Sequence, residues 1–255
     1  MARPETKTGR GRIRLEPGAK RVRALLGGEV VADTAHPMLV WEVPYYPAYY
    51  FPLADVRAEL EPDGGNVHSP SRGDARTYTV RVGGAEAPGA ALRYEGSPIE
   101  ELRDLVRLDW HAMDAWFEED EEVFTHPRDP YTRVDILAGS RLVRVEVGGA
   151  TIAESASPRL LFETGLPMRY YLPKTHVRLD LLVPSETVSH CPYKGRAEHW
   201  SVRAPDGVHD DIAWSYRTPL PESQKVTGLI AFYNEKVDTF LDGEPLERPV
   251  TPFSG

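Results

Sequence analysis

The sequence predicts a mainly-β protein made of two tandem copies of one small domain, each with one short helix. The main observation is an internal repeat at an offset of 121 residues. VRALLGGEVVADTAHP (22–37) matches VRVEVGGATIAESASP (143–158) at seven of sixteen positions. Self-similarity at a long fixed period indicates a duplication. Alternating apolar runs on both sides of each Gly-Gly pair indicate strands joined by tight hairpins.

The repeat also sets the domain boundaries. RIRLEPG (12–18) matches RVDILAG (133–139) at the same offset, so both segments are expected to be leading strands. We expect residues 1–9 to form an N-terminal tail, 10–128 the first copy and 129–255 the second. Copies of roughly 120 residues are long enough to bury a core without disulfides or metal.

Further strands follow in each copy. MLVWEV (38–43) and RLLFET (159–164) are apolar enough to be buried on both faces. YYFP (49–52) and YYLP (170–173) come next, and their prolines are expected to end the strands because proline cannot donate to a ladder. RAEHWSVR and DIAWSYR predict a hairpin through Asp206-Gly207. LIAFYNEKVDTFL (229–241) predicts a final hairpin through Asn234-Glu235.

The expected helices follow these strands. Ser97-Pro98-Ile99-Glu100 has the pattern of a capping box with proline at the first helical position. In the second copy PESQKVTG (221–228) takes this place. The copies differ most at 109–130, where six acids lie between residues 114 and 122 and HPRDP (126–130) forms the linker. Such an acidic run is either a solvated face or a partner-binding patch.

Composition limits the function classes. The net charge of −9 excludes the global electrostatic footprint of a nucleic-acid-binding protein. Cys191 is the single cysteine, so one chain forms neither an internal disulfide nor a four-cysteine zinc site. The first residues carry no apolar run, and no stretch approaches the roughly 18 apolar residues of a membrane span. We expect a cytoplasmic protein with no metal, no cofactor, and neither nucleic acid nor membrane as partner.

Three motifs resemble one bacterial family. GGEVVADTAHPMLVWEVPYYPAYYFPLADVR (27–57), HPRDPYTRVD (126–135) and VSHCPYKGRAEHWSV (188–202) are similar to domain of unknown function 427, in the tandem form common in actinobacteria. The resemblance implies a β-tent, or Mss4-like, fold in each copy, as in methionine sulfoxide reductase B and the thalidomide-binding domain of cereblon. It implies no activity. Many β-tent domains hold zinc with two cysteine pairs, and this chain departs from that pattern.

The most distinctive local motif is HCPYKG (190–195), which matches HSPSRG (68–73) at an offset of 122. Cys191 is a candidate catalytic nucleophile, because His190 and Lys194 supply positive charge that favours a thiolate. The alternative is a structural turn, since the first copy has Ser69 in its place. The matched bases Arg72 and Lys194 either form surface salt bridges or face an anionic ligand.

Aromatic residues recur at matched places in both copies. Consecutive tyrosines cannot both face the core, because strand side chains alternate between faces. An aromatic side chain on the outer face beside a base would form a ligand pocket. The candidate ligand-binding residues are Tyr49, Tyr50, Arg72, Tyr170, Tyr171, His190, Cys191, Lys194 and Trp214.

The leading functional hypothesis is a small-molecule-binding protein with an aromatic-lined cleft near HCPYKG and no covalent chemistry. One alternative is a cysteine-dependent, redox-type enzyme that uses Cys191. Another is a protein-interaction scaffold that uses the acidic segment 114–122. The residues leave open whether the protein is an enzyme, which ligand it binds, whether both copies are functional and which oligomer it forms.

Overall fold

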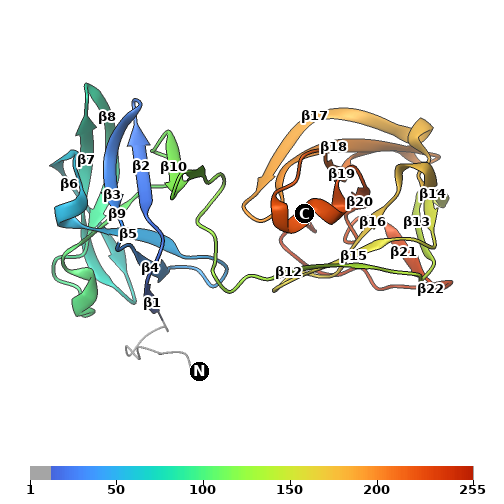
Figure 1. The fold of residues 1–255 in the computed structure, drawn as a ribbon, viewed down its shortest axis with the longest axis horizontal. Helices are drawn as coiled ribbons and strands as arrows, with labels where there is room; N and C mark the ends of the chain where they lie inside the picture. Colours follow the sequence, from blue (N-terminus) through green and yellow to red (C-terminus); the bar gives the residue numbers. More distant parts are fainter. Residues whose placement is uncertain (1–12, 255) are drawn as a thin grey trace. The chain divides into compact units, whose positions relative to one another are not determined.

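The computed structural model describes residues 13–254, so the predicted tail at 1–9 lies outside the described residues. The chain divides into two compact units, residues 1–129 (the first domain) and 130–255 (the second domain). Both consist of antiparallel strands joined by turns and short 3-10 segments (Figure 1). None of the helices in residues 13–254 is long and apolar enough to span a membrane.

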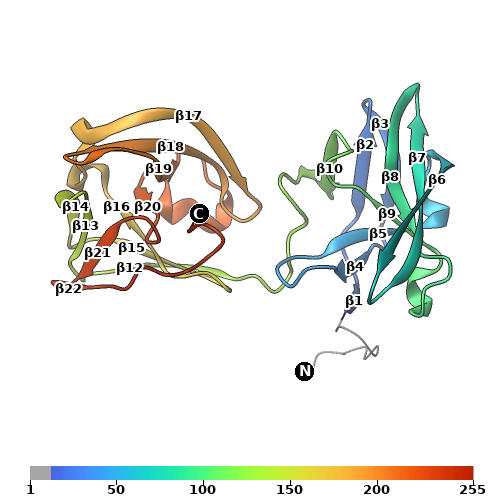
Figure 2. The same ribbon diagram turned by 180° about the vertical axis from the view of Figure 1, so that it is seen from behind.

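The first domain contains two sheets. The larger has seven strands in the order β1-β4-β5-β9-β8-β7-β6, and the smaller has four in the order β11-β10-β2-β3. Figure 2 shows β6, β7 and β8 as long neighbouring strands of the larger sheet. The strands are β1 (Arg14–Pro17), β2 (Val22–Leu26), β3 (Glu29–Thr34), β4 (Met38–Trp41), β5 (Ala48–Pro52), β6 (Glu59–Ser69), β7 (Gly73–Val82), β8 (Ala85–Arg93), β9 (Leu105–Leu108), β10 (Ala115–Glu118) and β11 (Glu121–Glu122).

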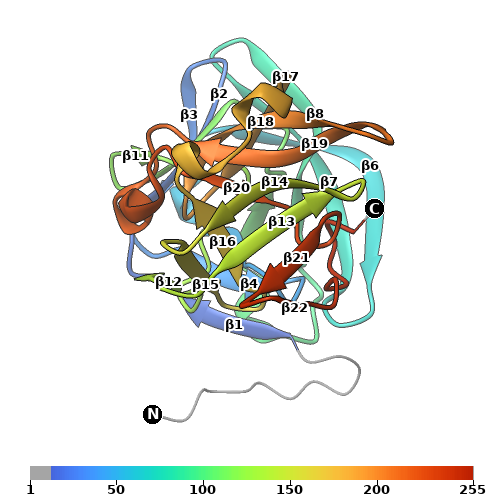
Figure 3. The same cartoon turned by 90° about the vertical axis from the view of Figure 1, so that its right-hand side faces the viewer.

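The second domain repeats this topology strand for strand, which confirms the predicted duplication. Its sheets have the orders β12-β15-β16-β20-β19-β18-β17 and β14-β13-β21-β22, and the four-stranded sheet faces the viewer in Figure 3. The strands are β12 (Val134–Ala138), β13 (Val143–Val147), β14 (Ala150–Ser155), β15 (Arg159–Glu163), β16 (Arg169–Leu172), β17 (Leu182–Cys191), β18 (Gly195–Ala204), β19 (Gly207–Tyr216), β20 (Ile230–Phe232), β21 (Asp238–Leu241) and β22 (Glu244–Pro245).

The main core of each domain joins residues of both sheets, and a smaller cluster involves the opposite face of the larger sheet. Consecutive tyrosines of one strand separate between these clusters. Tyr49 packs in the main core and Tyr50 in the smaller cluster, and Tyr170 and Tyr171 divide in the same way. The prediction that each pair faces both sides of the sheet is therefore confirmed.

Three predicted hairpins are present. Gly27-Gly28 and Gly148-Gly149 join β2 to β3 and β13 to β14 with φ between 55° and 79°, a region that favours glycine. The hairpin of β18 and β19 is also confirmed. Its turn consists of Pro205 and Asp206, because Gly207 already pairs with Ala204.

Two other predictions need correction. The predicted helices are 3-10 segments, Glu100–Leu102 and Pro221–Val226. The capping box does not form, since the Ser97 hydroxyl accepts from the Ile99 N–H. The predicted final hairpin is wrong, because β20 belongs to the seven-stranded sheet and β21 to the four-stranded sheet. The turn through Asn234 carries the chain from one sheet to the other.

Candidate functional site

Each domain contains a buried polar cluster in the smaller core, built from equivalent residues. We call it the tyrosine–glutamate–base cluster. In the second domain it consists of Glu163, Tyr171, Lys194 and Tyr216, and in the first of Glu42, Tyr50, Arg72 and Tyr94. Glu42 lies in the predicted strand MLVWEV and Glu163 in the predicted strand RLLFET, at matching positions of the repeat with its offset of 121. The sequence therefore held the signal for these acids, although they were not among the predicted site residues.

In the second domain the cluster centres on an ion pair. The Lys194 ammonium donates to the Glu163 carboxylate, and their side chains are only 10% and 8% exposed. The Tyr171 hydroxyl accepts a hydrogen bond from the Trp214 indole N–H at 3.1 Å. Burial raises the pKa of Tyr171 well above its ordinary value of 10, and the nearby Glu163 raises it further. The tyrosine hydroxyl is therefore protonated throughout the physiological pH range.

The first domain keeps the same set with different bonds. The Tyr50 hydroxyl donates to Glu42 at 2.6 Å, and Arg72 lies 3.6 Å from the same carboxylate. Arg72 also donates to the Tyr94 hydroxyl at 3.1 Å. Each acid is paired with the base of its own cluster, and Glu42 also accepts from Tyr50. The clusters therefore satisfy their buried charges internally, as buried charges require.

The HCPYKG loop supports this cluster. Cys191 ends β17 and is half-buried, while His190 is exposed. The Lys194 amide donates to the Cys191 carbonyl across the tight turn. The Lys194 ammonium, predicted to favour a Cys191 thiolate, is neutralised by Glu163.

A second buried ion pair was not predicted. The Arg169 guanidinium donates to both carboxylate oxygens of Glu235, at 2.5 and 2.6 Å. The Thr251 hydroxyl donates to the same carboxylate at 2.6 Å. The rings that surround the guanidinium belong to Trp214, Tyr233 and Phe253, at 5.7 to 5.9 Å. The first domain has Ala48 at the position of Arg169, so no repeat signal marked this pair.

The second domain has a hollow of about 160 Å³ beside Tyr170. It is lined by Pro167, Met168, Tyr170, Asn234, Thr239, Leu246, Glu247 and Pro249. Another hollow, of about 270 Å³, lies at the edge strand β12 and is lined by Ile136, Leu137, Ala138, Arg159 and Lys225. Of the predicted ligand-binding residues, only Tyr170 lines either hollow. Tyr171, Lys194 and Trp214 are buried elsewhere.

In the first domain, two tryptophans occupy the positions equivalent to Asn234 and Thr239. Trp116 pairs with Ala24 as Thr239 pairs with Val145. The Trp116 carbonyl accepts a hydrogen bond from the Val123 amide, and the Thr239 carbonyl accepts the equivalent bond from the Leu246 amide.

The second equivalence follows from a shared backbone bond. The Asp109 amide donates to the Ala90 carbonyl, and in the second domain the Tyr233 amide donates to the Ile212 carbonyl. Asp109 and Tyr233 are therefore equivalent, and so are the residues that follow them, Trp110 and Asn234.

The two tryptophans fill the first domain where the second is hollow. The rings of Trp110 and Trp116 stack with centroids 4.6 Å apart and an interplanar angle of 9°. Both rings also contact Tyr49, the equivalent of Tyr170, at 6.5 and 6.2 Å. The hollow therefore lies beside positions that hold stacked indoles in the other copy.

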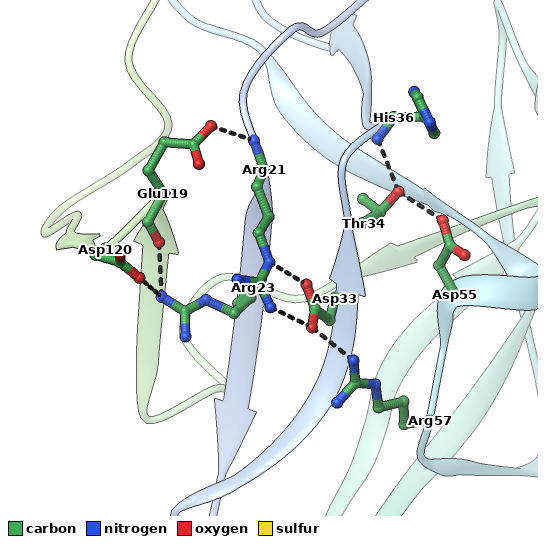
Figure 4. Close-up of polar contacts among 9 residues, drawn as sticks. All are labelled: Arg21, Arg23, Asp33, Thr34, His36, Asp55, Arg57, Glu119 and Asp120. Atoms are coloured by element: carbon green, nitrogen blue, oxygen red, sulfur yellow. Dashed lines mark hydrogen bonds and ion pairs between the residues drawn. The ribbon is translucent and has the colours of Figure 1, made fainter.

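The acidic segment 114–122 is largely paired within the first domain. Five of its six acids bind partners there: Asp114, Glu118, Glu119, Asp120 and Glu121. Figure 4 shows Arg23 reaching Asp120 and the Glu119 carbonyl, while Arg21 and Arg57 converge on Asp33. The segment includes the strand β10, so these acids connect parts of the first domain.

The described residues contain no group of three or more histidine, cysteine, aspartate or glutamate side chains placed to hold a metal ion. A family model described as domain of unknown function (DUF427) matches residues 14–119 and again 135–243. No curated protein matches the chain.

Proposed function

This chain belongs to the DUF427 family, with one copy of its domain in each half, and we propose that the second domain binds a small molecule with a planar ring. The proposed site is the hollow beside Tyr170. The observation that carries the proposal is the replacement of the stacked Trp110 and Trp116 by Asn234 and Thr239.

The space supports a ring of modest size. The hollow measures about 160 Å³, and apolar cavities of about 150 Å³ hold one benzene ring. Apolar groups of Pro167, Met168, Leu246 and Pro249 line it, so a ring would exchange water for apolar contact. Because Thr239 takes the position of Trp116, the second domain has room there for a ring that comes from solution.

Two hydroxyl groups give the hollow a polar side. Tyr170 and Thr239 are each 5% exposed, and neither hydroxyl has a hydrogen-bond partner among residues 13–254. Both residues line the hollow, so a bound molecule can reach these hydroxyls. A ligand with a hydrogen-bonding group would bond to one of them, which supports binding of a ring that also carries a polar substituent.

The proposed site is not the predicted cleft near HCPYKG. Of the predicted ligand-binding residues it contains Tyr170, whereas Lys194 and Tyr171 belong to the buried tyrosine–glutamate–base cluster. The cysteine-dependent alternative gains no support from the neighbourhood of Cys191, because the Lys194 charge is already paired with Glu163.

Binding of indole to the full chain tests the proposal. We expect indole to perturb the amide NMR signals of residues 167–170 and 234–249 in a saturable manner. Thr239→Trp, which restores the residue of the first domain, should abolish this perturbation. Leu137→Trp is the matched control, since it adds an indole beside the other hollow. The absence of saturable binding, or binding that Thr239→Trp leaves unchanged, would refute the proposal.

A further inference from the structure

We infer that the ligand of the second domain is an aromatic monocarboxylic acid, whose carboxylate is received by Tyr170 and Arg141. This inference rests on the proposed function and adds the chemical class of the ligand. It follows from a carboxylate that the first domain supplies from its own chain and the second domain lacks.

The carboxylate of the first domain belongs to Glu118, a buried residue of β10. It accepts one hydrogen bond from the Tyr49 hydroxyl. Its other oxygen lies 2.5 Å from the Lys20 ammonium. Glu118 and Trp116 are two residues apart on one strand, so both side chains face the same side. The first domain thus places an indole and a carboxylate together against Tyr49.

The second domain keeps the two donors and lacks the acceptor. Tyr170 corresponds to Tyr49, and Arg141 corresponds to Lys20 at the offset of 121. The position of Glu118 is taken by Leu241, which pairs with Val143 as Glu118 pairs with Val22. Leucine accepts no hydrogen bond, so the Tyr170 hydroxyl has lost the carboxylate that its counterpart binds.

Arg141 is held beside the strand position that lost the carboxylate, because it binds Asp242, the residue after Leu241. Burial raises the pKa of Tyr170, and the Arg141 charge opposes that rise. The guanidinium donates from Nε to Asp242 at 2.7 Å and is 55% exposed. An arginine has five N–H donors, so donors beyond the one at Nε are free to bind a carboxylate.

Glu247 restricts the ligand to one acid group. Tyr170 and Thr239 form the buried part of the hollow, whereas Glu247 is exposed at its outer part. A second carboxylate on the ligand would meet the Glu247 carboxylate and be repelled. The ring therefore occupies the space beside Thr239, and the single acid group lies at Tyr170.

Calorimetric titration of the full chain with indole-3-acetate, indole-3-acetamide and indole tests this inference. We expect the acid to bind at least about tenfold more tightly than the amide, because hydrogen bonds to charged groups are the stronger ones. Arg141→Gln, at an exposed position, should remove the acid preference and leave indole binding unchanged. Leu241→Glu, which restores the carboxylate of the first domain, should abolish acid binding and retain indole.

The outcomes separate the two proposals. If indole binds and the acid and amide bind equally, the acid class is wrong and ring binding stands. If the acid is preferred but Arg141→Gln keeps that preference, the assignment of Arg141 is wrong. If none of the three compounds binds, the proposed function itself fails.

Discussion

The ammonium of Lys194 donates a hydrogen bond to the carboxylate of Glu163 in an interior where both side chains are nearly inaccessible to solvent. The first domain repeats this relationship with Arg72 and Glu42. A buried pair of this kind is stabilising only as a pair, because each charge left alone would be desolvated without compensation.

Lys194→Met is therefore expected to destabilise the second domain by about 3–5 kcal/mol. The double variant Lys194→Met/Glu163→Leu should recover most of that loss, because it removes the unpaired carboxylate. Urea unfolding followed by tryptophan fluorescence measures both. Arg178→Ala is the control, since it breaks an exposed ion pair with Asp180 and should leave the midpoint unchanged. Equal destabilisation by the single and double variants would contradict the prediction.

Trp116→Thr places in the first domain the residue found in the second. We expect a loss of about 3–5 kcal/mol, the range for removing a buried tryptophan side chain, because Trp116 packs against Trp110, Tyr49 and Phe51. Millimolar indole should recover part of this stability by entering the vacated space. Thermal unfolding with and without indole measures the recovery, with Trp116→Phe as a variant that leaves less space. No recovery specific to Trp116→Thr would count against the prediction.

The sequence predicted the duplication, the main strands and the division of the tyrosine pairs, because these depend on matched residues and strand alternation. The β-tent assignment stays a prediction from the family resemblance. The hollow could not be predicted, because a gap-free comparison of the two copies does not align Trp116 with Thr239. The segments around Trp116 and Thr239 share few identities, such as Phe117 with Phe240, and the preceding turn is one residue longer in the first domain. Only the pairing of β10 with β2 and of β21 with β13 places them together.

The pair of Arg169 and Glu235 was missed for a different reason. Its acid lies in the turn that was predicted to close a hairpin, and connecting turns normally lie at the surface. The change of sheet between β20 and β21 instead brings Glu235 against Arg169. Tertiary topology determined this contact, and local sequence gave no sign of it.

His199 is expected to make stability depend on pH. Burial lowers its pKa below the ordinary value of 6.5, and the nearby Asp211 only opposes that effect. Since the folded state binds the proton less readily than the unfolded state, protonation favours unfolding. Stability should be full above pH 6.5 and should fall as the pH drops below it.

Urea midpoints of wild type and His199→Gln between pH 7.5 and 5 measure this dependence. Glutamine retains an amide that can bond to the Ser189 hydroxyl, the present partner of the ring at 2.8 Å. We expect a shallower decline for His199→Gln, with His68→Gln, at an exposed position, as the control. Parallel curves for wild type and His199→Gln would contradict the assignment.

The turn between β2 and β3 provides a matched pair of glycine substitutions. Gly27 and Gly28 both have positive φ, 62° and 79°, so alanine at either position is strained, by about 1–2 kcal/mol. A Cβ at Gly27 would also lie 2.6 Å from the Cβ of Ala85, whereas one at Gly28 meets nothing within 4 Å. Because the Ala85 side chain has no torsion that moves its Cβ away, the backbone must shift. Gly27→Ala should therefore lower the urea midpoint of the first domain more than Gly28→Ala, and equal midpoints would show that the hairpin adjusts freely.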